Sequence, residues 1–116
     1  MFVIARRRKA QPPPPWVVWE ALTEPNRDPA RPWLEPRMGE TVPRVLEARH
    51  PTLVVWSSLW LAHPDDQIRF DLAPSGSDTS LEWSLLSPRQ IGPEEVSPRR
   101  RRLNELINGQ LRDTFG

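Results

Sequence analysis

The chain contains no cysteine, no tyrosine and only one lysine, Lys9, among its 116 residues. Without cysteine the protein has no disulfide bond, no thiolate nucleophile and no sulfur-ligated zinc. This composition fits a cytoplasmic protein, which is the location we expect. No run approaches the roughly 20 apolar residues that a membrane span needs, and the apolar stretch from Met1 to Ala5 is too short for a signal peptide. We therefore expect no integral membrane association.

A strong charge of one sign is also missing, because the formal net charge is only +1. Two basic runs, Arg6 to Lys9 and Arg99 to Arg102, carry no interleaved aromatic residues. Consecutive residues on a helix point in different directions, so the second run cannot present all four charges to one partner. We expect both runs to be solvated surface, and we expect no nucleic-acid partner.

The familiar motifs of catalysis are absent as well: the chain has no Gly-rich phosphate loop, no H-E-x-x-H sequence and no nucleophile motif. His50 and His63 each stand beside a proline, where a role in a turn is expected. The sequence His63-Pro64-Asp65-Asp66 offers adjacent loop ligands without a distant fourth one, which is a weak metal signal. We therefore assign no catalytic residue, no metal ligand and no cofactor.

Proline and tryptophan are abundant, with fifteen and six residues. The length fits a single domain over residues 1–116. Four of the prolines fall between Pro25 and Pro36. Because proline lacks a backbone N–H and restricts the residue before it, residues 25–36 are expected to form an irregular segment without a regular helix.

The last twenty residues, Ser97 to Gly116, carry the clearest helical pattern. Leu103, Leu106, Ile107 and Leu111 recur at helical spacing and form one apolar stripe. The start of this helix is open: Pro98 occupies its first turn if the helix starts near Ser97, and it lies inside the helix if the start is near Pro93. In either case the stripe must be buried against another layer.

We predict that this layer is a sheet, because apolar and polar residues alternate with a period of two in the rest of the chain. Consecutive strands joined by short turns favour an antiparallel meander. A short helix from Pro15 to Leu22 is expected to interrupt the order after the first strand. The expected strands are Phe2–Arg8, Thr41–Arg49, Thr52–Leu61, Gln67–Leu72 and Thr79–Leu86.

Five phrases of the sequence give this order a family resemblance: VVWEALTEP at 17–25, RPWLE at 31–35, VLEARHPTLVVWSSLW at 45–60, IRFDLAPSGSDTSLEWSLL at 68–86 and RLNELINGQLR at 102–112. Through these phrases the chain resembles the SRPBCC superfamily, also called START-like or Bet v 1-like. The resemblance is close to its polyketide-cyclase/lipid-transport and Hsp90-ATPase-activator-like members. It implies an α+β helix-grip fold, in which a curved antiparallel sheet wraps around a long C-terminal helix.

In this family the space between sheet and helix is often a cavity for lipids, sterols or polyketides. The resemblance therefore implies that the chain binds a hydrophobic small molecule of the lipid or polyketide class. Two alternatives stay open. One is a cyclase or aromatase enzyme, and the other is a protein-interaction module of the Hsp90-activator-like kind, with a protein partner. The proline-rich residues 25–36 depart from the family pattern and favour a small cavity or none.

The candidate ligand-binding residues are those expected between sheet and helix. An indole ring suits a flat apolar ligand because it has large apolar faces and one N–H donor. The competing interpretation is that the tryptophans and leucines only fill the core, that the glutamine is solvated and that the serine only packs beneath its neighbours. The candidates are Trp33, Trp56, Ser58, Trp83, Leu103, Ile107, Gln110 and Leu111.

Overall fold

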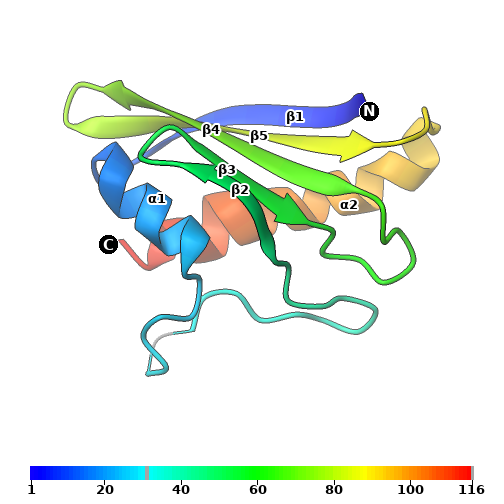
Figure 1. The fold of residues 1–116 in the computed structure, drawn as a ribbon, viewed down its shortest axis with the longest axis horizontal. Coiled ribbons are helices and arrows are strands. Elements are labelled where there is room, and N and C mark those ends of the chain that lie inside the picture. The colour runs from blue at the N-terminus through cyan, green and yellow to red at the C-terminus, as the bar shows by residue number, and fades with distance from the viewer. Residues whose placement is uncertain (31, 116) are drawn as a thin grey trace.

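The computed structural model describes residues 1–30 and 32–115, and it shows one five-stranded antiparallel sheet with a long helix across it (Figure 1). The strands lie side by side in the order β1-β5-β4-β3-β2, so β4 is the central strand. The elements are β1 (Phe2–Gln11), α1 (Pro15–Thr23), β2 (Val45–Arg49), β3 (Leu53–Ser57), β4 (Gln67–Ser75), β5 (Asp78–Ser87), α2 (Pro93–Glu105) and the π-helix η1 (Leu106–Leu111).

The period-two alternation decides which face of the sheet meets the helix. On β4, Ile68, Phe70 and Leu72 are buried, whereas Arg69 between them is exposed. The register places Phe70 between Val54 of β3 and Trp83 of β5, so apolar side chains form a row across the inner face. This row belongs to the single apolar cluster between sheet and helices. The α+β helix-grip architecture predicted from the sequence is confirmed.

The C-terminal helix begins at Pro93, which decides between the two predicted starts. Pro93 occupies the first helical position after Gly92, where its missing N–H removes no helical hydrogen bond. Glu94 and Glu95 lie in the first turn, where negative charge complements the helix dipole. Pro98 therefore lies inside α2, and the Ser97 hydroxyl donates back to the Pro93 carbonyl (2.7 Å) instead of capping a helix start.

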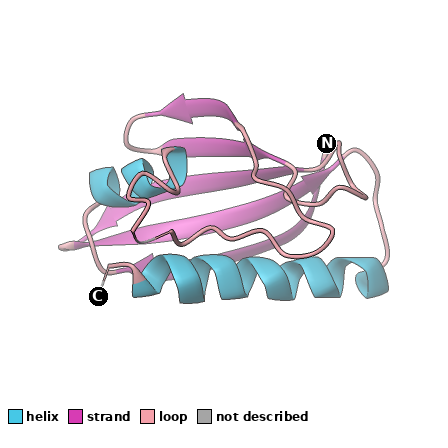
Figure 2. Cartoon of the chain, turned by 90° about the horizontal axis from the view of Figure 1, so that it is seen from below, coloured by secondary structure: helices cyan, strands magenta, loops and turns pink. Residues whose placement is uncertain are grey.

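Beyond Glu105 the helix continues without interruption as η1, and Figure 2 shows α2 and η1 running along the length of the sheet. The end of β1 holds this π-helical turn. The Gln11 side-chain N–H donates to the Asn108 side-chain oxygen at 3.2 Å and to the Ile107 carbonyl at 3.5 Å. Because π-helical turns are rare and often mark functional sites, η1 is a candidate functional segment.

Residues 24–44 connect α1 to β2 without a helix or strand among the residues described there. Asn26 anchors the loop, since its side-chain amide donates to the Leu34 carbonyl at 3.1 Å and accepts from the Leu34 N–H at 3.4 Å. The predicted strand start at Thr41 is wrong, because the chain pairs there only through one bridge between Glu40 and Trp60. Regular pairing begins at Val45, after the buried Pro43.

Candidate functional site

Six of the eight candidate residues meet between the sheet and the C-terminal helix. Trp56 and Trp83 belong to the inner face of the sheet, and the stripe of the helix lies in the same apolar cluster, from α2 and η1. Trp33 joins them from the 24–44 loop. Apart from Trp33, which is 7% exposed, these side chains have no exposed surface. Sheet and helix thus close a dry core around them, and their part in ligand binding stays a prediction. The helix residues in this group are Leu103, Ile107 and Leu111.

Only one of the three buried indole N–H groups of this core has an acceptor among the described residues. The Trp56 N–H donates to the Leu22 carbonyl of α1 at 2.8 Å. The N–H groups of Trp33 and Trp83 are buried and have no acceptor among the described residues. Trp33 stacks on Trp56, with ring centroids 6.1 Å apart, and Trp56 meets Phe70 edge to face at 4.6 Å. Buried polar groups without a partner are rare and require an explanation.

A hollow of about 300 Å³ opens beside Trp33, between α1 and the end of the chain. Apolar side chains, among them Val17, Ala21, Trp33 and Phe115, line one part of it, and the charged residues Glu20, Glu24, Arg27 and Asp28 line the rest. We call it the Trp33 hollow. It connects the surface with the ring that stacks on Trp56, so it is the solvent-facing approach to the tryptophans of the core.

The other two candidates, Ser58 and Gln110, make polar contacts of their own. The Ser58 hydroxyl accepts from the Trp60 N–H at 3.0 Å and donates to the Trp60 carbonyl at 3.2 Å, which shapes the end of β3. The Gln110 side-chain oxygen accepts from Arg102 at 3.3 Å. The structure therefore gives both side chains partners within the protein.

The expectation that Arg99 to Arg102 are all solvated is wrong for two of the four. Arg99 and Arg102 are 4% and 5% exposed, whereas Arg100 and Arg101 are exposed. Residues three apart share one side of a helix, so these two arginines point together toward the loop that precedes β2 and the loop that follows β3. Arg99 pairs with Asp66 and Arg102 pairs with Glu40. In the sequence, only the three-residue spacing of Arg99 and Arg102 indicated that these two side chains share one side of the helix.

The guanidinium of Arg102 is the centre of a buried network. Its Nε donates to the two Glu40 carboxylate oxygens at 3.2 and 2.9 Å, and its Nη2 donates to Glu40 at 3.0 Å. The same Nη2 donates to the Glu35 carbonyl at 3.1 Å. Together with the bond to Gln110, these contacts fix the 35–40 loop against the side of α2.

A more exposed ion pair lies next to this network, where Arg37 donates to both carboxylate oxygens of Glu105 at 3.2 and 2.8 Å. The hydrogen bonds from Arg37 lower the pKa of Glu105 below its ordinary value of 4.5. A lowered folded-state pKa stabilises the fold above the unfolded pKa, and this contribution is lost as the pH falls through the folded pKa.

We expect the carboxyl carbon signal of Glu105, followed by NMR, to titrate with a midpoint below 4.5. In the Arg37→Ala variant the midpoint should move upward, because the donor that favours the charged form is gone. Arg100→Ala, which removes an exposed neighbouring charge, is the matched control and should move it much less. Equal midpoints in the wild type and Arg37→Ala would contradict the pair.

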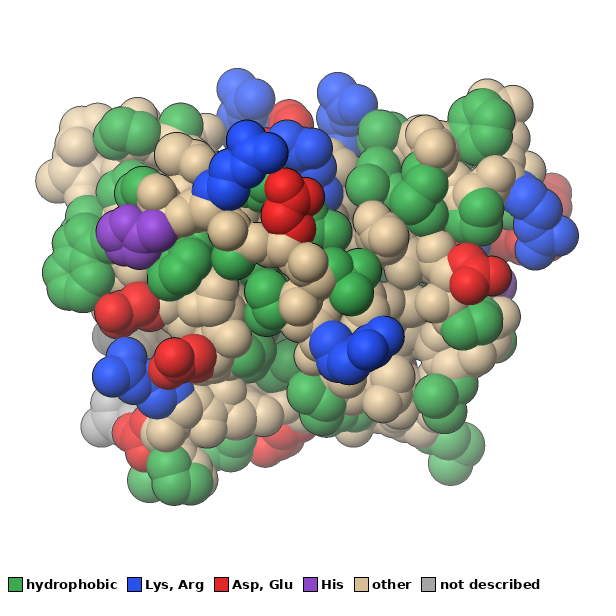
Figure 3. Space-filling view, in the orientation of Figure 1, with side chains coloured by type: hydrophobic (Ala, Val, Ile, Leu, Met, Phe, Trp, Pro, Cys, Tyr) green, Lys and Arg blue, Asp and Glu red, His purple; other side chains and the backbone are tan. Residues whose placement is uncertain are grey.

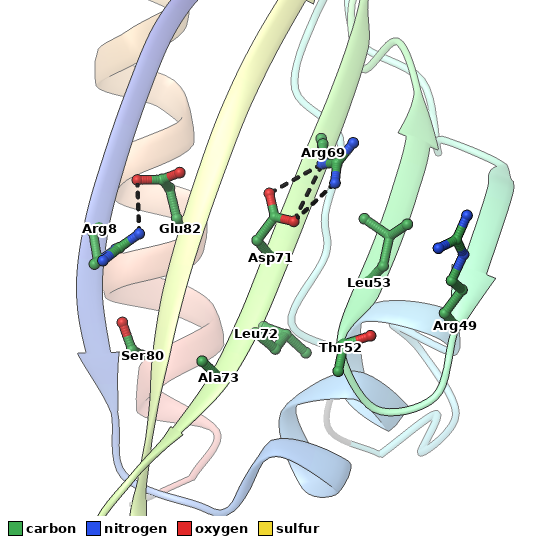
Figure 4. A pocket seen from close by; sticks show the side chains of 10 residues that line it. All are labelled: Arg8, Arg49, Thr52, Leu53, Arg69, Asp71, Leu72, Ala73, Ser80 and Glu82. Atoms are coloured by element: carbon green, nitrogen blue, oxygen red, sulfur yellow. Dashed lines mark hydrogen bonds and ion pairs between the residues drawn. The ribbon is translucent and has the colours of Figure 1, made fainter.

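The outer face of the sheet carries a hollow of about 290 Å³ that is lined by three arginines, Arg8, Arg49 and Arg69, and two acids, Asp71 and Glu82 (Figure 4). Arg8 pairs with Glu82 at 3.5 Å, and Arg69 pairs with Asp71 at 3.1 Å. On the face drawn in Figure 3, positive and negative side chains are scattered among hydrophobic ones and form no continuous patch of one sign.

The predicted turn at His63 carries no metal arrangement. Within residues 1–30 and 32–115, no three His, Cys, Asp or Glu side chains are grouped so that they could hold a metal ion. Asp66 instead pairs with Arg99. Over the same residues, no helix is both long enough and apolar enough to cross a membrane.

Together, the gripping sheet, the long C-terminal helix and the tryptophan-rich layer between them define an α+β helix-grip protein. No family model matches the sequence, and no curated protein matches it. Solved structures match the fold. The crystal structure of CalU16 from Micromonospora echinospora has a TM-score of 0.69 and 20% identity, over 90% of this chain and 70% of that one.

Two further structures have the same architecture. The solution structure of the Aha1 dimer from Colwellia psychrerythraea has a TM-score of 0.71 and 16% identity, over 97% of this chain and 95% of that one. DynU16 is described as a putative protein in the dynemicin biosynthetic locus. It has a TM-score of 0.65 and 19% identity, over 91% of this chain and 45% of that one. The chain thus has the fold that its resemblance to the SRPBCC superfamily predicts.

Proposed function

We propose that this protein binds a hydrophobic small molecule of the lipid or polyketide class between its sheet and its C-terminal helix. The observation that carries the proposal is the pair of buried indole N–H groups, of Trp33 and Trp83, without an acceptor among the described residues. A carbonyl or hydroxyl oxygen of a ligand would accept from them. The rings around these donors supply the apolar contact area that a flat ligand needs.

The ligand would enter at the Trp33 hollow. Its volume of about 300 Å³ is at the lower end of the range for small-molecule sites. Because the core beyond Trp33 is closed, a larger ligand requires the helix to move away from the sheet. We propose that η1 is the part that moves, since the hydrogen bonds from Gln11 to Ile107 and Asn108 are weak restraints at 3.5 and 3.2 Å.

The likeness to DynU16 makes a small-molecule ligand the first class to test. DynU16 is described as a putative protein in the dynemicin biosynthetic locus. At 19% identity this likeness carries the fold and not the ligand. Emodin, an aromatic polyketide, and oleate, a fatty acid, are therefore suitable as two separate probes.

The test is an NMR titration of the indole N–H signals with emodin or oleate. We expect the signals of Trp33 and Trp83 to shift, because their free donors gain an acceptor. The signal of Trp56 should shift less, because its N–H keeps the Leu22 carbonyl. Unchanged indole signals and unchanged tryptophan fluorescence with both probes would refute binding at this site.

Two matched substitutions test the contrast between the indoles in the free protein. We expect Trp56→Phe to lower the free energy of unfolding by about 1–3 kcal/mol more than Trp83→Phe, because only Trp56→Phe leaves a buried carbonyl, that of Leu22, without its donor. Urea denaturation measures both values. A loss for Trp83→Phe as large as that for Trp56→Phe would mean that the Trp83 N–H has an acceptor in solution.

The cyclase or aromatase alternative needs an acid or base beside the bound ligand. The described core cluster consists of apolar side chains. The buried arginines of α2 are already paired, Arg99 with Asp66 and Arg102 with Glu40. Binding without chemistry is therefore the better supported form of the proposal.

A second candidate function is protein interaction, and the edge strand β2 favours it. All five residues of β2 are exposed, including Val45 and Leu46, and its outer edge offers backbone hydrogen-bonding groups to another strand. The comparison with the Aha1 dimer makes self-association the first partner to test. Light scattering after size exclusion should show a dimer that Leu46→Glu dissociates; a monomer at all concentrations would oppose self-association.

A further inference from the structure

The edge strand β1 carries four consecutive basic residues, 6–9, along one border of the sheet (Figure 1). All four are exposed, as predicted from the sequence. Within residues 1–30 and 32–115, only Arg8 of the four has an acidic partner, Glu82 at 3.5 Å. We call residues 6–9 the basic edge. Most of its charge is not compensated by the part of the chain that the structure describes.

The side chains of the basic edge are divided between the two faces of the sheet. Arg7 lies opposite Trp83 of β5, so Arg7 and Lys9 belong to the inner face. Arg6 and Arg8 alternate with them and belong to the outer face. A strand placed beside the basic edge would therefore meet two positive side chains on each of its faces.

The turn between β4 and β5 decides which backbone groups of β5 point toward β1. Ser75 and Asp78 are paired, with only two residues between them, so the Asp78 N–H and C=O point toward β4. Backbone groups along a strand alternate in direction from one residue to the next. Trp83, an odd number of positions after Asp78, therefore points its N–H and C=O toward β1.

The same alternation leaves backbone groups of the basic edge free. Because Arg7 is the partner of Trp83, its N–H and C=O point toward β5, and those of Arg6, Arg8 and Ala10 point away from the sheet. The Ala10 carbonyl confirms this direction, since it accepts from the Arg112 side chain. No backbone group elsewhere in the described chain pairs with the outward groups of Arg6 or Arg8. They can bond to an added strand.

The C-terminal helix adds a further positive charge on this side. Asn108 of η1 accepts from Gln11 at the end of β1, and it donates to Asn104 at 3.4 Å, so both asparagines lie on the side of the helix near β1. Arg100 is four residues before Asn104 and shares that side. Its side chain is exposed, so it reinforces the charge of the basic edge.

Backbone and charge together indicate which partner fits. A second copy of β1 would place like charges opposite one another, which is destabilising and is a common protection of edge strands. A nucleic acid would leave the outward peptide groups without a ladder, and the run has no aromatic side chain on which a base could stack. An extended acidic segment of another protein satisfies both the peptide groups and the charges.

We propose that β1 binds an extended acidic segment of a partner protein as a sixth strand of the sheet. The segment exchanges backbone hydrogen bonds with Arg6 and Arg8, and its carboxylates lie opposite the basic side chains on both faces. This surface is independent of the proposed ligand site and of the β2 edge, since it shares no residue with either.

The experiment compares three peptides: acetyl-TIEEEEIT-amide, acetyl-TIEEPEEIT-amide and acetyl-TIKKKKIT-amide. We expect the first to bind at least about tenfold more tightly than the second, because proline interrupts the ladder while the four glutamates remain. The lysine peptide should not bind, because its charges repel the basic edge. Equal affinities of the two glutamate peptides would mean attraction by charge alone and would overturn the proposal.

Amide hydrogen exchange, followed by NMR, tests the added ladder directly. The N–H groups of Arg6 and Arg8 should exchange at least about tenfold more slowly with acetyl-TIEEEEIT-amide bound, because they gain acceptors. The N–H of Arg7, which already points toward β5, should change much less. Unchanged exchange at Arg6 and Arg8 in the saturated complex, or a short DNA duplex that binds more tightly than the peptide, would overturn the proposal.

Two charge reversals locate the surface. Arg6→Glu alters an exposed side chain of the basic edge and should weaken acetyl-TIEEEEIT-amide about tenfold or more. Arg44→Glu is the matched control, since it makes the same change of charge at an exposed position just before β2, at the opposite border of the sheet. Equal weakening by the two variants would show that only the net charge matters and would refute the assignment to β1.

Discussion

Replacing Arg102 by methionine should lower the free energy of unfolding by about 3–5 kcal/mol. The substitution leaves the Glu40 carboxylate, only 6% exposed in its side chain, buried without a counter-charge. It also removes the donors to Gln110 and to the Glu35 carbonyl. Breaking one side of a buried pair has a large cost because the remaining charge loses both water and partner.

The neighbouring Arg101 supplies the matched control. It belongs to the same basic run but is exposed, so Arg101→Met should change the stability by less than about 0.5 kcal/mol. The double variant Glu40→Leu/Arg102→Met should recover most of the loss, since an apolar pair of similar volume needs no compensation for buried charge. Urea denaturation at neutral pH measures all three variants. Equal losses for Arg101→Met and Arg102→Met would contradict the buried network.

This network shows what the sequence could not reveal. The partners are 62 residues apart for Arg102 and Glu40, and 33 residues apart for Arg99 and Asp66. Both acids lie in irregular segments, so no periodicity relates them to the arginines. The run of four arginines suggested a solvated surface because local pattern reports only which residues share a helix face. Which face the loops cover depends on tertiary packing.

The sheet and the stripe of the helix, unlike the buried network, could be predicted because they depend on local sequence patterns. Alternation on β4 and β5 places Phe70 and Trp83 on the inner face, and the spacing of Leu103, Ile107 and Leu111 places them on one side of the helix. Local periodicity alone decides these orientations. Local periodicity does not decide where the helix starts, because both Pro93 and Pro98 suit a first turn. Pro93 begins the helix and Pro98 is accommodated inside it.

The π-helical turn η1 also escaped prediction. The stripe positions Leu106, Ile107 and Leu111 are compatible with both α- and π-helical winding, since all three are buried in η1. A contact that the sequence does not show accompanies the π-helical winding: Gln11, 96 positions away, donates to the Ile107 carbonyl. If η1 moves to admit a ligand, the site depends on an irregularity that only the folded arrangement contains.

The final prediction tests whether the core is closed. Phe70 lies on the central strand β4, has no exposed surface and packs edge to face on Trp56 at 4.6 Å. Phe70→Ala should lower the free energy of unfolding by about 3–5 kcal/mol, because it removes apolar contacts and leaves a cavity. The adjacent Arg69→Ala, on the outer face, should cost less than about 1 kcal/mol, since it breaks only a half-exposed ion pair.

Urea denaturation followed by tryptophan fluorescence measures both losses, and the same Phe70→Ala protein tests the proposed function. The cavity left by the ring would adjoin Trp56 and Trp83, so emodin should bind this variant more tightly than the wild type if it binds between sheet and helix. A loss of less than about 1 kcal/mol for Phe70→Ala would mean that the inner face is not packed against the helix in solution. Such a result would contradict the dry core and remove the need for η1 to move before a ligand can enter.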